Sequence, residues 1–105
     1  MRLASFTNNE TASYGIVTDD GIVDAGRRLG ASLPGLRAAL GDLDQVAALA
    51  GEAADFALAD VQLEPPIPDP HRLLCIGVNY RKHVEEVGHE VPEHPSIFAR
   101  CLDSI

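Results

Sequence analysis

Short runs of alternating apolar and polar residues fill the first 25 positions of the chain, and this pattern is typical of short β-strands. We expect three strands, at Arg2–Phe6, Ser13–Thr18 and Gly21–Ala25. Polar residues 7–11 separate the first two, and Asp19-Asp20-Gly21 separates the second from the third. An Asp-Gly pair between apolar runs indicates a tight β-hairpin. The sequence therefore predicts that the chain begins with antiparallel strands.

The spacing of apolar residues then changes to that of helices. Two short helices are expected, at Leu33–Leu40 and Leu43–Ala50. The Ala-rich stretch 47–59 contains leucine and phenylalanine residues that can pack, so we expect it to be ordered. The capping and breaking residues that set the ends of the helices are Ser32, Pro34, Gly41, Asp42 and Gly51.

A proline-rich connector divides the chain. Val61–Leu63 alternates like an edge strand, and prolines follow at positions 65, 66, 68 and 70. Because proline restricts the backbone, this segment should be stiff and extended. We place a domain boundary here, between a small β-rich N-terminal module with short helices, residues 1–66, and a second domain, residues 67–105.

Beyond the connector, an apolar strand is followed by a helix that carries candidate catalytic residues. Leu73–Val78 is apolar throughout, which predicts a strand buried on both faces, and Gly77 permits a turn or the close approach of a ligand. The pattern becomes helical from Tyr80 to Val87. His83 and Glu86 are three residues apart and share one helix face, where a carboxylate can orient an imidazole. This pair is our candidate general base.

Composition restricts the classes of partner. The chain has 105 residues, a formal net charge of −8 and a pI near 4.7. Nucleic acids and anionic membranes require a basic patch, so we expect neither as a partner. No apolar run approaches membrane-spanning length, and the first residues do not resemble a signal peptide. We expect a cytoplasmic protein whose partners are small molecules or further copies of itself.

Cysteine and histidine residues suggest neither a disulfide framework nor a zinc site. Cys75 and Cys101 are expected to be reduced core thiols. His83, His89 and His94 are spaced six and five residues apart, which does not place two ligands on one helix face. We therefore assign no metal ligand within this chain.

The second half of the chain resembles the fumarylacetoacetate hydrolase family. Residues 76–86 match the motif "I-G-x-N-Y-x-x-H-x-x-E", and residues 95–100, Pro95-Ser96-Ile97-Phe98-Ala99-Arg100, match "P-x-[IL]-F-x-[KR]". The resemblance covers about Pro70 to Ile105. Three N-terminal stretches, residues 1–6, 14–17 and 21–24, are similar to a looser region of bacterial members.

The resemblance implies a fold and a set of functional residues. The fold would be α+β, with the N-terminal module followed by the start of a mixed β-roll catalytic domain in which residues 81–93 form a lid over the substrate. His83 and Glu86 would be catalytic, and Arg100 would face the substrate, where many relatives have lysine. Asn79 and Tyr80 would either fix the strand end or reach the substrate.

The resemblance also implies an activity. The intact enzyme would be a metal-dependent hydrolase of aromatic-compound catabolism, which cleaves a carbon–carbon bond in 2,4-dioxo acids of the fumarylpyruvate or acylpyruvate type. Mg²⁺ or Mn²⁺ would hold the 2-oxo acid through a Glu-x-Glu pair and an Asp downstream of this chain, while Glu86 and His83 activate water. Family members are commonly homodimers.

Two alternatives remain open from the sequence. The same base could serve an isomerase or decarboxylase of acids resembling 2-hydroxyhepta-2,4-diene-1,7-dioate. The chain could also be a truncated interaction module without catalysis. Phe98–Ile105 is mostly apolar with no turn signal after it, so we expect the chain to be a fragment of a longer protein.

Overall fold

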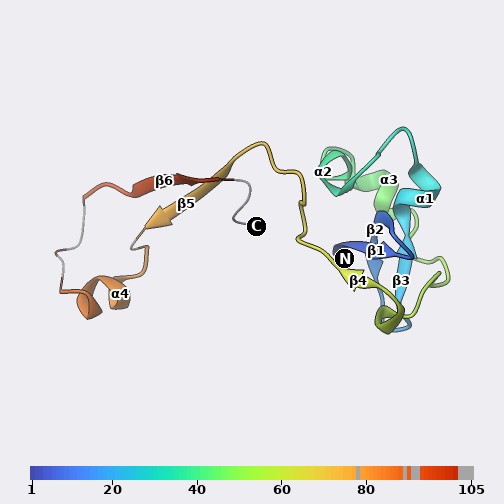
Figure 1. The fold of residues 1–105 in the computed structure, drawn as a ribbon, viewed down its shortest axis with the longest axis horizontal. Coiled ribbons are helices and arrows are strands. Elements are labelled where there is room, and N and C mark those ends of the chain that lie inside the picture. Colours follow the sequence, from blue (N-terminus) through green and yellow to red (C-terminus); the bar gives the residue numbers. More distant parts are fainter. Residues whose placement is uncertain (78, 89, 91–92, 102–105) are drawn as a thin grey trace. The chain divides into compact units, whose positions relative to one another are not determined.

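A computed structural model describes residues 1–77, 79–88, 90 and 93–101 of the chain. It divides into two compact units, Met1–Pro68 and Asp69–Ile105, each of which is described by itself (Figure 1). Whether these units are the domains expected from the sequence, 1–66 and 67–105, stays a prediction. Both units combine strands with helices.

The N-terminal unit is built on a four-stranded antiparallel sheet of order β3-β2-β1-β4. Its strands are β1 (Arg2–Asn8), β2 (Thr11–Val17), β3 (Ile22–Asp24) and β4 (Gln62–Leu63). The three expected N-terminal strands are confirmed, with ends shifted by up to two residues. The predicted edge strand is also confirmed, because β4 pairs with β1 at the end of the sheet.

The first two hairpins differ in the length of their loops. Asn8 pairs with Thr11, so Asn9 and Glu10 alone make the first turn, and both have positive φ, 45° and 66°. This conformation is the one that matches the twist of paired strands. The turn is tighter than the separator 7–11 expected from the sequence. The Asp-Gly hairpin is confirmed, and there the Thr18 N–H donates to the Gly21 carbonyl at 2.8 Å.

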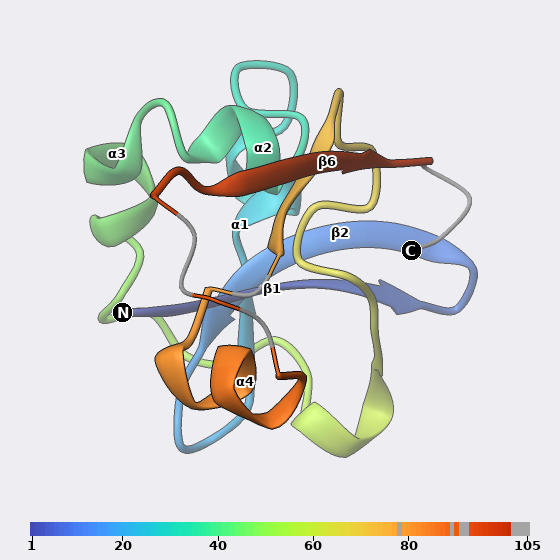
Figure 2. The ribbon, with the colours of Figure 1, turned by 90° about the vertical axis from the view of Figure 1, so that its left-hand side faces the viewer.

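Helices α1 (Ala25–Leu29), α2 (Leu36–Ala39) and α3 (Leu43–Ala47) lie on one side of this sheet (Figure 2). The sequence did not predict α1. The expected helix at 33–40 begins only at Leu36. Pro34 restricts the backbone of the residue before it, Leu33, and disfavours helical geometry there. The helix at 43–50 ends at Ala47 and continues as tighter i to i+3 turns. Its cap is as expected, since the Asp42 side chain accepts from the Gln45 N–H.

The core lies between the helices and the sheet. Alternate residues of β2 point into it, and Tyr14 is 1% exposed. Its hydroxyl donates to the Leu33 carbonyl at 2.9 Å. Burial, and secondarily the negative charge of Asp24, raise the pKa of the Tyr14 phenol. The buried residues of this cluster are Tyr14, Ile16, Val23, Ala25, Leu33, Leu36, Ala39 and Val46.

The other face of the sheet carries a smaller cluster. Phe6 and Ile22 are buried there, and the Phe6 ring packs edge-on against Phe56 with centroids 6.0 Å apart. The segment that carries Phe56 joins β3 through main-chain bonds, in which Ile22 N–H donates to the Phe56 carbonyl at 2.9 Å. The Ala-rich stretch is therefore ordered, as expected, and it ends in a short 3₁₀ helix, Leu58–Asp60.

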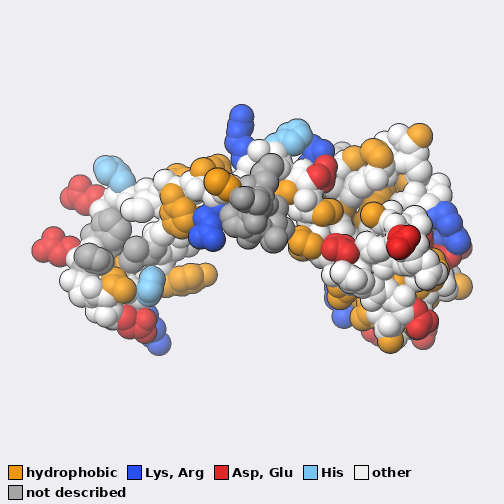
Figure 3. All heavy atoms as spheres, viewed as in Figure 1, with side chains coloured by type: hydrophobic (Ala, Val, Ile, Leu, Met, Phe, Trp, Pro, Cys, Tyr) orange, Lys and Arg blue, Asp and Glu red, His pale blue; other side chains and the backbone are white. Residues whose placement is uncertain are grey.

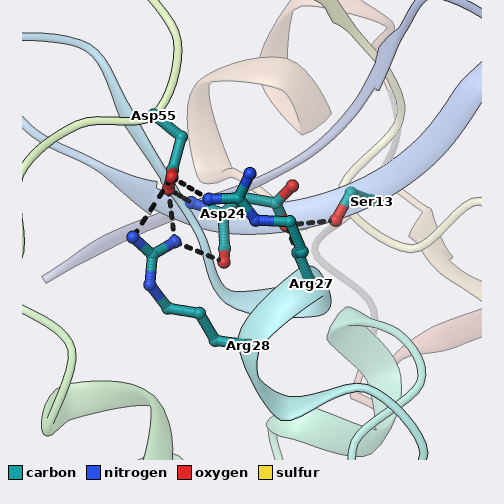
Figure 4. A network of polar contacts seen from close by, with 5 residues as sticks. All are labelled: Ser13, Asp24, Arg27, Arg28 and Asp55. Atoms are coloured by element: carbon teal, nitrogen blue, oxygen red, sulfur yellow. Dashed lines mark hydrogen bonds and ion pairs between the residues drawn. The ribbon is translucent and has the colours of Figure 1, made fainter.

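The carboxylate of Asp55, whose side chain is 9% exposed, fastens this segment to the start of α1 (Figure 4). It accepts from the Asp24 N–H at 2.8 Å and pairs with the guanidinium groups of Arg27 and Arg28. The hydrogen bond from Arg28 is the largest cause that lowers the pKa of Asp55 below its usual value. Asp24 caps α1, since its Oδ1 accepts from the Arg27 N–H at 2.8 Å and from the Ser13 hydroxyl at 2.6 Å.

The second unit contains a two-stranded antiparallel ribbon, β5 (Leu73–Gly77) with β6 (Ser96–Arg100), and helix α4 (Arg81–Glu86). The strand and the helix were both predicted, but the prediction that the strand is buried on both faces is wrong. Leu74 is 65% and Ile76 is 53% exposed. A strand that pairs along one edge of β5 does not cover the faces of the ribbon, which require a further layer. Hydrophobic side chains are accordingly visible on the surface of the ribbon (Figure 3). Val78 lies outside the described residues.

The two cysteines are not core residues. Cys75 is half-buried in β5 and Cys101 is exposed, and neither forms a disulfide. The expected place of both cysteines in the core is therefore wrong, and their reduced state stays a prediction. The same incomplete cover of the ribbon accounts for this difference. Within the described part of the chain, no helix is long and apolar enough to span a bilayer.

We expect Asp55→Asn to destabilise the N-terminal unit by about 1.5–3 kcal/mol at neutral pH, the usual cost of a lost hydrogen bond to a charged group. Because folding lowers the pKa of Asp55, its stabilisation is complete above the unfolded-state value and is lost as pH falls through the lower folded-state value. Urea unfolding at pH 7 and at pH 3 measures both effects. Asp19→Asn is the control, since its ion pair with Arg2 is exposed; equal losses in the two variants would contradict the role of Asp55.

Gly15→Ala should destabilise the sheet by about 1–3 kcal/mol, the usual cost of overpacking. A Cβ atom at Gly15 would lie 2.1 Å from the Val23 carbonyl oxygen on the neighbouring strand, which is backbone and cannot move aside. Gly51→Ala is the matched control, because a Cβ there meets nothing within 4 Å. Thermal melting compares the two variants, and a Gly15→Ala variant as stable as Gly51→Ala would show that the strands can separate locally.

Candidate active site

Helix α4 follows directly from the end of β5, which sets the position of the candidate catalytic pair. Tyr80 is the N-cap of α4 with an extended backbone, and its carbonyl accepts from the N–H groups of His83 and Val84 at 2.9 and 3.1 Å. Val84 is buried, 2% exposed, and anchors the helix. Gly88, at φ 69°, follows the last turn and its N–H donates to the Glu85 carbonyl. A short helix is thus fixed at both ends with its polar side chains outward.

The structure brings His83 and Glu86 together, as their spacing predicts. His83 Nδ1 and Glu86 Oε2 lie 3.7 Å apart, with 55% and 75% of the side chains exposed. This separation is longer than a hydrogen bond, and water screens an exposed pair. The contact orients the imidazole only weakly, and both groups remain accessible to a ligand. Their catalytic assignment stays a prediction.

Asn79 and Tyr80 occupy the segment between the end of β5 and α4. Both are exposed, and Tyr80 is 75% exposed. Tyr80 uses its main chain to cap the helix, which leaves its phenol directed to the outside. The main chain of Tyr80 begins helix α4, and whether Asn79 and Tyr80 fix the strand end or reach the substrate stays a prediction.

Arg100 lies at the other end of the ribbon. It pairs with Leu73, whereas Gly77, next to the segment that leads to α4, pairs with Ser96. Arg100 lies four positions after Ser96, about 13 Å along the strand. The structure does not place Arg100 at the ribbon end from which Asn79 and Tyr80 continue, and its role as a substrate-binding cation stays a prediction.

Glycine at position 77 permits a turn or the close approach of a ligand; the backbone there is ordinary, and the approach of a ligand stays a prediction. The φ of Gly77 is outside the left-handed region, and a Cβ atom there would meet the Phe98 ring at an ordinary 3.5 Å. The predicted lid, residues 81–93, includes α4 and the turn at Val87–Gly88. His89, Val91 and Pro92 lie outside the described residues, so the lid also stays a prediction.

The cluster of Ser13, Asp24, Arg27, Arg28 and Asp55 was not predicted from the sequence. Asp24 gave one usable signal, because an Asp directly before Ala25 is a common N-cap. Asp55 gave no such signal, since it lies in an Ala-rich stretch. The residues that it contacts are separated from it by 27 to 31 positions in the sequence. Among the described residues, no group of three or more His, Cys, Asp or Glu side chains is arranged to hold a metal ion.

Two of the similar curated proteins are named as oxaloacetate tautomerases. No family model matches the chain. The oxaloacetate tautomerase YisK of Bacillus subtilis is 46% identical over 48 residues, which cover 43% of this chain and 16% of that protein. The mitochondrial oxaloacetate tautomerase fahd2 of Xenopus laevis is 30% identical over a 118-residue alignment, which covers all of this chain and 36% of that protein.

A solved structure is similar as well. The crystal structure of a "putative HpcE protein" from Mycobacterium smegmatis superposes with a TM-score of 0.70 and 28% identity, covering 95% of this chain and 36% of that one. This similarity confirms the fold class predicted from the sequence, α+β with a β-rich N-terminal module and the start of a mixed β-roll. The chain thus spans about a third or less of the length of these relatives.

We expect Mg²⁺ and Mn²⁺ to bind the 105-residue chain only weakly, because hard cations require several oxygen ligands at one place. Isothermal titration calorimetry at neutral pH should show no saturable heat at micromolar metal. A tight, stoichiometric site would contradict this prediction, and Glu85, Glu86, Glu90 and Glu93 would then be the first residues to substitute.

Proposed function

The chain belongs to the fumarylacetoacetate hydrolase family, and from this premise we propose that it carries the general base of an enzyme acting on a small 2-oxo acid. The observation that carries the proposal is the His83–Glu86 contact on an exposed face of α4, directly after the strand that begins the family motif. The 3.7 Å between His83 Nδ1 and Glu86 Oε2 is longer than a hydrogen bond, and catalytic contacts of this kind often tighten only when substrate binds.

The proposed reaction is the interconversion of keto and enol forms. One member of the pair takes a proton from the carbon next to the 2-oxo group, and a proton is delivered to the oxygen as the double bond shifts. The reverse steps restore the ketone, so atoms and electrons balance without an oxidant. The second member orients the first, and if His83 takes the proton, the Glu86 carboxylate balances the charge of the imidazolium. Two relatives named as oxaloacetate tautomerases support this class of reaction.

A second candidate is hydrolysis of a carbon–carbon bond in 2,4-dioxo acids of the fumarylpyruvate or acylpyruvate type. The resemblance of residues 76–86 and 95–100 to the family motifs supports it. Here the same pair would remove a proton from water, which attacks the distal carbonyl. Product analysis separates the candidates: tautomerisation and isomerisation conserve the carbon skeleton, whereas hydrolysis releases two acids.

The described residues do not fit an all-protein site for Mg²⁺ or Mn²⁺, since no suitable group of ligands is present among them. We propose that carboxylates beyond this chain hold the metal, and that activity therefore requires a protein of the relatives' length. We also propose that the protein of that length forms a homodimer.

In a protein of that length, His83→Ala and Glu86→Ala should each lower turnover of oxaloacetate or a dioxo acid by about two to four orders of magnitude, the usual contribution of a general base. The double variant should be little worse than either single variant, because the two groups act as one unit. Steady-state rates followed by enol absorbance provide the measurement.

Glu85→Ala is the matched control, since Glu85 neighbours the pair in sequence but lies on another helix face. It should keep its turnover. Near-normal turnover in either His83→Ala or Glu86→Ala, with an unchanged melting temperature, would remove the pair from the mechanism.

A further inference from the structure

A pocket opens on the N-terminal unit, on the sheet face that carries Phe6. Its volume is about 480 Å³, within the range of small-molecule sites. Three separate stretches line it: the β1–β2 hairpin, the start of α1, and Phe56. All of them belong to one compact unit, and none belongs to the His83–Glu86 region.

Two aromatic rings form the apolar part of this pocket. Phe6 and Phe56 meet edge to face, with an interplanar angle of 64°. Phe6 is 1% exposed and forms the closed floor of the pocket, so the half-buried Phe56 offers the accessible ring surface. Aromatic clusters of this geometry accept a further ring, either offset or edge-on.

The polar part of the pocket offers both donors and acceptors. The Arg27 side chain is 62% exposed and contacts Asp55 through Nη2, whereas a guanidinium carries five N–H donors. The exposed Thr11 hydroxyl lies on the same strand face as Ser13. The Asp24 carboxylate also lines the pocket.

Charge in this region is balanced. Asp24 and Asp55 supply two negative charges, and Arg27 and Arg28 supply two positive charges. A ligand carboxylate would approach Asp24 and compete with Asp55 for Arg27. A ligand cation would approach Arg27 in the same way. An uncharged ligand avoids both costs.

We propose that this pocket binds a small, uncharged aromatic ring that bears a carboxamide, separately from the His83–Glu86 pair. The ring packs against Phe56 above the floor formed by Phe6, the amide oxygen accepts from Arg27 or Thr11, and the amide N–H donates to Asp24. The site goes beyond the proposed catalytic activity.

Titration of the ¹⁵N-labelled chain with benzamide tests this inference, with benzoate and benzylamine as probes of the same size and opposite charge. Benzamide should shift the amide signals of Phe6, Ser13 and Gly26 and saturate in the millimolar range, as expected for a ligand of this size. Benzoate and benzylamine should bind at least several-fold more weakly. Equal or tighter binding of either charged probe would overturn the proposed ligand class, and no saturable shift with any probe would overturn the site.

Substitution of Thr11 tests whether benzamide binds in this pocket. Thr11→Trp should abolish the shifts by filling the space from an exposed strand position, with melting temperature as a check on folding. Gln62→Trp is the control, because Gln62 pairs with Thr7 and lies on the opposite sheet face. Thr11→Leu is a smaller blocking variant if the tryptophan prevents folding. If the Thr11 variants bind benzamide as well as Gln62→Trp does, the ligand binds outside this pocket.

Discussion

The contacts of the Asp55 carboxylate hold the second face of the N-terminal unit together. This carboxylate gathers the Asp24 N–H and the side chains of Arg27 and Arg28, all from β3 and the start of α1. Through it, a segment with little regular structure becomes part of the sheet's second face and brings Phe56 onto Phe6. Two arginines and a backbone N–H compensate the cost of placing this carboxylate where it is only 9% exposed.

Strand patterns were the most predictable part of the fold. Alternation in residues 2–25 and the Asp-Gly turn depend on local chemistry, and the structure has strands at those places. Helices were less predictable. Pro34 delays α2 through a backbone constraint on Leu33, and α1 was missed because Gly26 and the arginines at 27 and 28 interrupt its apolar pattern.

The candidate site was predictable only as far as local spacing determines it. His83 and Glu86 share a face because a helix repeats every 3.6 residues. The place of Arg100 depends on which residue of β6 pairs with Leu73, and the long connection between the strands does not fix that register. The burial of β5 was predicted wrongly for a related reason, since an apolar run reveals what side chains prefer but not how many neighbours they have.

The two tyrosines have a practical consequence for following this molecule in solution. The chain has no tryptophan and only these two phenols, so its intrinsic fluorescence comes from Tyr14 in the first unit and Tyr80 in the second. Tyr14 is enclosed and hydrogen-bonded, whereas Tyr80 is open to solvent. A collisional quencher such as acrylamide will therefore reach one emitter and spare the other. Each half of the chain thus carries its own optical label, without chemical modification.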